Sequence, residues 1–60
     1  MNLTSKELSA IEDLINGEAN TVKKFRMYAQ NSPDPQIKAK YEQLAAKHQE
    51  HFNRLLTFLN

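Results

Sequence analysis

The chain has 60 residues, no cysteine and a formal net charge of +1. It forms at most one small domain, which no disulfide or thiolate-bound metal can stabilise. Its net charge is also too small for the basic surface with which proteins bind nucleic-acid phosphates. No apolar run approaches the roughly 20 residues that span a bilayer, and the N-terminus lacks the pattern of a signal peptide. We therefore expect a single cytoplasmic domain, residues 1–60, with neither nucleic acid nor a membrane as partner.

The first expected element is a long amphipathic helix over residues 4–30. Thr4 and Glu7 have the spacing of a capping box at its start. Apolar residues then recur in steps of three and four, which is typical of one helix face, and Glu18 occupies one position of this stripe. The members of the stripe are Leu8, Ile11, Ile15, Glu18, Val22, Phe25 and Ala29.

A glycine lies near the centre of this expected helix. The pair Asn16-Gly17 is typical of a turn, and a glycine inside a helix costs about 1 kcal/mol relative to alanine. The periodicity nevertheless continues through both residues without a slip, which favours one uninterrupted helix. Gly17 either allows another backbone to approach beside Glu18 or is simply tolerated.

A turn is expected at residues 31–34. Pro33 disfavours helical geometry in the residue before it, whereas Asp34 is a good N-cap and Pro35 suits a first helical turn. The second helix is therefore expected over residues 35–59. Its stripe again advances in steps of four and three, with two histidines among its members: Ile37, Tyr41, Leu44, His48, His51, Leu55 and Phe58.

The two stripes predict an antiparallel hairpin. Paired residues in such a hairpin have position numbers with a constant sum, and every pair of the two stripes gives 66. Half of this sum is 33, the number of the first proline of the turn. The register places Glu18 opposite His48 and Ile15 opposite His51. We therefore predict an all-α fold, a two-helix antiparallel hairpin.

A single hairpin cannot bury both stripes together with the residues that widen them, which are Leu14, Thr21 and Tyr28 beside the first stripe and Ala45, Phe52, Leu56 and Leu59 beside the second. Their aromatic residues leave a large apolar patch exposed, which is typical of an interface. Two hairpins packed face to face bury the patch in a four-helix bundle with two-fold symmetry. We expect a homodimer, or a higher oligomer of the same hairpin. The aromatic residues concerned are Phe25, Tyr28, Tyr41, Phe52 and Phe58.

Glu18, His48 and His51 form the candidate site, because polar residues in an apolar stripe need a partner or a function. In a dimer this layer contains two glutamates and four histidines. Imidazole and carboxylate together suit iron, zinc or nickel, so the layer is a candidate metal site. The alternative is a metal-free contact between Glu18 and His48 that sets the register rather than adding stability.

An enzyme is not expected from this sequence. No serine has a histidine near it in the hairpin register, and no glycine-rich loop is available to hold a phosphate. A glutamate–histidine pair could exchange protons as general acid and base, but two helices offer no substrate pocket beyond the dimer core. We therefore name no catalytic residue and no organic cofactor.

The candidate ligands resemble those of ferritin-like proteins such as rubrerythrin. In that family, a glutamate on one helix and a Glu-x-x-His motif on the next form half of a di-iron four-helix bundle. The resemblance implies that Glu18 and His51 are ligands, whereas His48 stands where the motif has its glutamate. This departure disfavours a di-iron oxidase. It favours a single zinc, nickel or iron ion, or an abandoned site.

The patterns of residues 3–8, 12–14, 24–29 and 44–56 extend over nearly the whole chain. In these patterns the chain also resembles the bacterial spore coat F family and its short relatives. The similarity implies a structural or assembly role in sporulation, a spore coat or forespore location, and other spore coat proteins as partners. We therefore predict a small structural or assembly protein, with a ferritin-like metal-binding protein as the alternative.

Overall fold

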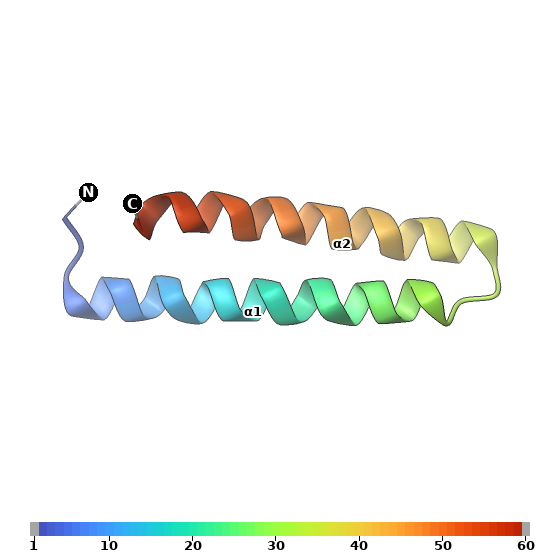
Figure 1. Ribbon diagram of the computed structural model, residues 1–60, viewed down its shortest axis with the longest axis horizontal. Coiled ribbons are helices and arrows are strands. Elements are labelled where there is room, and N and C mark those ends of the chain that lie inside the picture. Colours follow the sequence, from blue (N-terminus) through green and yellow to red (C-terminus); the bar gives the residue numbers. More distant parts are fainter. Residues whose placement is uncertain (1, 60) are drawn as a thin grey trace.

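The computed structural model describes residues 2–59 and consists of two antiparallel helices joined by a short turn (Figure 1). Helix α1 comprises Ser5–Gln30, helix α2 comprises Pro35–Leu56, and a 3₁₀ turn, η1, comprises Thr57–Leu59. The Cα atoms extend over 46 × 14 × 11 Å. The predicted all-α hairpin is confirmed, and residues 2–59 contain no strand.

Helix α1 begins at the capping box that the sequence predicts. The Thr4 hydroxyl accepts a hydrogen bond from the Glu7 N–H at 3.1 Å, and the Glu7 carboxylate accepts one from the Thr4 N–H at 3.0 Å. The backbone N–H of Thr4, followed by its hydroxyl, lowers the pKa of the exposed Glu7 carboxyl below its usual value. At the other end, the Asn31 side chain donates to the Met27 carbonyl at 2.9 Å. Both ends of α1 are thus closed by residues next to it in the sequence.

Gly17 occupies an ordinary helical position in the middle of α1. Its φ is not positive, and a Cβ built on it meets no atom of the hairpin outside its own helix within 4 Å. We therefore expect Gly17→Ala to raise the free energy of unfolding by about 0.5–1 kcal/mol, because alanine loses less backbone entropy on folding. Urea unfolding followed by circular dichroism measures this change. A decrease would show instead that another chain approaches the backbone closely at this position.

Asp34 starts helix α2, as the sequence predicts. Its carboxylate accepts hydrogen bonds from the N–H groups of Gln36 at 2.8 Å and Ile37 at 3.2 Å. The end of α2 differs from the prediction, because the α-helix stops at Leu56 rather than at residue 59. The Thr57 hydroxyl donates to the Arg54 carbonyl at 2.6 Å, and the last three described residues tighten into η1.

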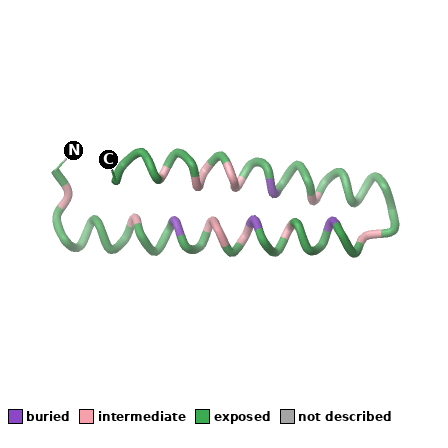
Figure 2. The backbone as a smooth tube through the Cα atoms, in the orientation of Figure 1, coloured by how far each residue is buried: buried purple, intermediate pink, exposed green. Residues whose placement is uncertain are grey.

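The helices pack through a narrower stripe of α2 than the sequence predicts. The buried residues are Ile15, Val22 and Ala29 on α1 and Ala45 on α2 (Figure 2). Leu44, which the register pairs with Val22, is 38% exposed, and its neighbour Ala45 is buried instead. Two packed helices bury only the side chains on the line along which they touch. The small side chain of Ala45 lets α1 and α2 come close on this line, and larger side chains such as Leu44 lie beside it and stay partly exposed.

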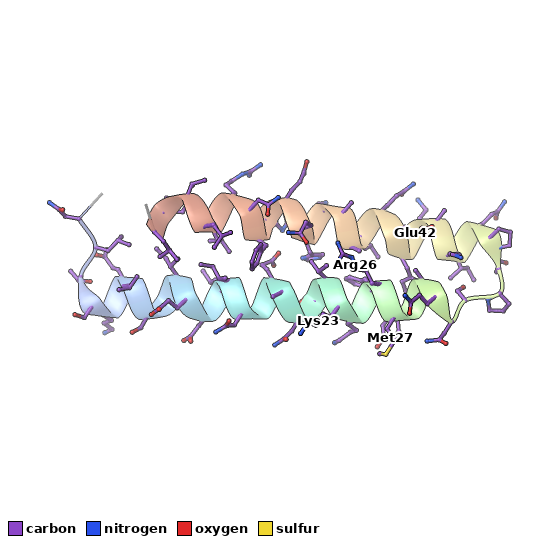
Figure 3. All side chains as sticks on the ribbon, viewed as in Figure 1. Lys23, Arg26, Met27 and Glu42 are labelled. Carbon is purple, nitrogen blue, oxygen red and sulfur yellow. The ribbon has the colours of Figure 1, made fainter. Side chains whose placement is uncertain are left out.

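One broad face of the hairpin carries charged side chains. Helical periodicity places Lys23, Arg26 and Glu42 on this face, and Figure 3 labels them together with the exposed Met27 of α1. The other face, here called the apolar face, carries an aromatic cluster and large hydrophobic side chains that α1–α2 packing leaves partly exposed. Neither described helix has the length and hydropathy required to cross a membrane. The apolar face consists of Leu14, Glu18, Phe25, Tyr28, Ile37, Tyr41, Leu44, His48, His51 and Phe58.

Candidate metal centre

The structure brings Glu18, His48 and His51 together on the apolar face. The Glu18 Oε2 atom lies 3.1 Å from His48 Nδ1 and 3.2 Å from His51 Nδ1. The register placed only His48 opposite Glu18 and paired His51 with Ile15. One carboxylate reaches both rings because the histidines are three residues apart on one helical face and the glutamate side chain is long. The three residues thus form one cluster rather than two separate layers.

Aromatic side chains hold one side of this cluster. The His48 ring stacks against Phe25, with ring centroids 5.7 Å apart and planes inclined by 29°. His51 meets His48 edge-on, with centroids 5.3 Å apart, and Phe25 also stacks on Tyr41 at 6.1 Å. Such packing restricts how each ring can rotate. Sequence reasoning did not assign Phe25 and Tyr41 to the site, although the register pairs them two layers away from Glu18 and His48.

The cluster is half-buried within the hairpin. The exposed fraction of the side chain is 21% for Glu18, 27% for His48 and 40% for His51. No described side-chain nitrogen or oxygen is both buried and without a hydrogen-bond partner. Neither helix covers the cluster from the side of the apolar face. Water therefore has access to these polar groups unless another surface packs on that face.

The donor atoms suit a transition-metal ion. Glu18, His48 and His51 each offer one ligand atom, and these atoms all lie within 4.8 Å of one another. Imidazole nitrogen and carboxylate oxygen are common ligands of zinc, nickel and ferrous iron, and three ligands leave a fourth position open. The cluster therefore meets the requirements of a site for one ion, whose fourth ligand would come from another group.

The cluster does not fit the di-iron centre that the ferritin-like resemblance implies. Two divalent ions bring four positive charges, and each chain contributes one carboxylate, Glu18, to the cluster. His48 contributes a neutral imidazole where the family motif has a glutamate. The excess positive charge would be costly inside a bundle, because an uncompensated buried charge is strongly unfavourable. The residues present therefore fit a single ion better than a pair.

Comparison with models of protein families, with curated proteins and with solved structures found no match to this chain. The resemblances to ferritin-like and spore coat F proteins are therefore expectations from the sequence alone. What the site can do is inferred from the positions of its own donor atoms.

Proposed function

We propose that this chain is the subunit of a homodimeric four-helix bundle that binds a divalent transition-metal ion at Glu18, His48 and His51. The observation that carries the proposal is the Glu18 carboxylate, which lies within 3.2 Å of a ring nitrogen of both histidines. Three donor groups from two helices meet at one point of an otherwise apolar face.

The amount of exposed surface supports the dimer. The hairpin exposes 4790 Å², whereas a compact monomer of its 6.9 kDa mass exposes roughly 4,000 Å². The excess is comparable to the roughly 800 Å² that each partner buries in a stable protein interface. Much of it is apolar, since Tyr28 is 41% exposed, Leu44 38% and Ile37 49%. A second copy is the simplest surface with which to cover this face.

The position of the cluster along the hairpin supports a shared site. Glu18 lies at the middle of α1 (Ser5–Gln30), and His48 lies close to the middle of the segment formed by α2 and η1. A two-fold axis that brings the apolar faces together, either along the hairpin or perpendicular to it at mid-length, keeps the two clusters at the same level. Dimerisation would then exclude water from both clusters and strengthen their electrostatic interactions.

A structural or assembly protein without a metal is the second candidate. It is supported by the contacts of Glu18, whose carboxylate accepts a hydrogen bond from His48 and lies 3.2 Å from Nδ1 of His51 without any ion. In this case the cluster sets the register of the bundle, and the apolar face serves assembly. The spore coat F resemblance expected from the sequence would add other coat proteins as partners, in the cytoplasm, the forespore or the spore coat.

Metal retention tests the proposed function. Purified protein is incubated separately with zinc, nickel and, without oxygen, iron(II), then desalted and analysed for metal per chain. We expect one of these ions to be retained at about one per two chains. The double variant His48→Ala, His51→Ala is expected to retain none, because it removes both nitrogen ligands.

Gln49→Ala, Asn53→Ala is the matched control for this experiment. These two residues lie on the same helix as the histidines and hydrogen-bond to each other at 3.0 Å. The control is expected to retain metal like the unmodified chain. If the unmodified chain retains no metal, the metal-binding proposal is wrong and the structural candidate stands.

A further inference from the structure

We infer that the ion is bound by the Nε2 atoms of four histidines, His48 and His51 from each chain, and that Glu18 positions these rings without ligating the ion. This arrangement rests on the proposed function, because it requires both the dimer and the metal. It differs from the carboxylate-bridged di-iron centre of the ferritin-like resemblance in its ligands and in the number of ions. It also changes the role of Glu18 from a ligand to a positioning residue.

The first argument is the edge of each ring that faces Glu18. Nδ1 is the atom of both histidines that approaches the carboxylate, at 3.1 Å in His48 and 3.2 Å in His51. A carboxylate only accepts hydrogen bonds, so the His48 contact favours a proton on Nδ1 and leaves the lone pair of the neutral ring on Nε2. In His51 the same edge of the ring faces the carboxylate. A histidine that binds a metal commonly donates its other N–H to a carboxylate, which sets the tautomer and the ring orientation.

The second argument is the number of ligands. Within the described part of the chain, the hydrogen bonds of the His48 ring are made by Nδ1, the Nδ1 atom of His51 also faces the carboxylate, and neither Nε2 is buried without a partner. One chain therefore offers two free Nε2 atoms, whereas a tetrahedral ion takes four ligands. The two-fold axis described above brings a second pair, the partner's His48 and the partner's His51, to the same level. The site is thus incomplete without the second copy.

The third argument is charge. Four neutral imidazoles leave the two positive charges of one divalent ion uncompensated within its own coordination shell. The two Glu18 carboxylates, one from each chain and each within 3.2 Å of the Nδ1 atoms of two rings, balance those charges. The complete site is then neutral, which lowers the cost of placing the ion in a bundle core. A second ion would leave two positive charges without partners.

X-ray absorption of the zinc-loaded protein tests this arrangement directly. We expect one zinc per two chains and a shell of four nitrogen ligands at about 2.0–2.1 Å. Multiple scattering from the imidazole rings counts the histidines, and we expect four. Two ions per dimer, or fewer than four imidazoles with oxygen ligands in their place, would overturn the arrangement while leaving the proposed function intact. Absence of retained zinc, nickel and iron would overturn both.

Glu18→Gln separates positioning from ligation. The glutamine carbonyl still accepts a hydrogen bond from Nδ1–H, so we expect four imidazoles, an unchanged stoichiometry and a zinc affinity about 10- to 100-fold lower. His51→Ala is expected to lose the ion, and His51→Gln repeats this test if the alanine variant does not fold by circular dichroism. Glu50→Gln, which removes the same charge from an exposed position of α2, is expected to bind zinc normally. Loss of the ion in Glu18→Gln, with its fold retained, would make Glu18 a ligand and overturn the inference.

Discussion

If the proposed dimer forms, Leu44→Glu is expected to separate it into chains that do not fold stably. Leu44 lies on the apolar face, where it is 38% exposed in the hairpin and would be covered by the second copy. The two-fold axis brings two new carboxylates into one interface, and each loses its hydration without gaining a partner. We expect the dissociation constant to rise at least about 100-fold, which corresponds to about 2.7 kcal/mol. Sedimentation velocity measures the dissociation, and circular dichroism measures the accompanying loss of helix.

Ala46→Glu is the matched control for this change. Ala46 is exposed and lies two residues further along α2, about 200° around the helix. It introduces the same charge into the same helix outside the apolar face, so the dimer is expected to persist. If Leu44→Glu leaves the dimer unchanged, the apolar face is not the interface. If Ala46→Glu separates the chains instead, the hairpins associate through the opposite face.

Replacing Glu18, His48 and His51 together by leucine is expected to stabilise the bundle while abolishing metal binding. In the proposed dimer these three residues would lose water, and a buried set of polar groups often fails to recover its desolvation cost. Leucines fill a similar space without that cost, so we expect the free energy of unfolding to rise by about 1–4 kcal/mol in the presence of a chelator. Urea unfolding at one fixed protein concentration makes the comparison valid for a dimer.

The control for added hydrophobicity places three leucines on the polar side of α2. Glu42→Leu, Gln49→Leu, Asn53→Leu adds the same residue type at positions outside the apolar face. Each such surface substitution usually changes the free energy of unfolding by no more than about 0.5 kcal/mol. A lower unfolding midpoint for the Glu18, His48 and His51 triple variant would show that the cluster contributes net stability. The free energy gained from the Glu18 contacts would then exceed the desolvation cost of the three polar side chains.

Glu18 and its two histidines show how far the sequence alone could predict the site. The periodicity of the two stripes identified all three residues and placed Glu18 opposite His48, because the register follows from residue numbers and the position of the turn. It did not show that the same carboxylate also lies 3.2 Å from His51. It also did not show that Nδ1, rather than Nε2, faces the carboxylate in both rings. Ring orientation depends on neighbours such as Phe25, which come from the other helix.

The sequence by itself determined the elements of this protein and their order. The helix ends are set by Thr4, Asp34 and the prolines of the turn, which act through the hydrogen bonds and φ angles of adjacent residues. Because these effects are local, they can be predicted from the sequence. The tertiary structure alone decided that Ala45 is buried while Leu44 is left on the apolar face. Both are apolar, and their order around α2 cannot reveal which lies on the line of contact. That line depends on how closely two helices approach, which small and large side chains on both determine together.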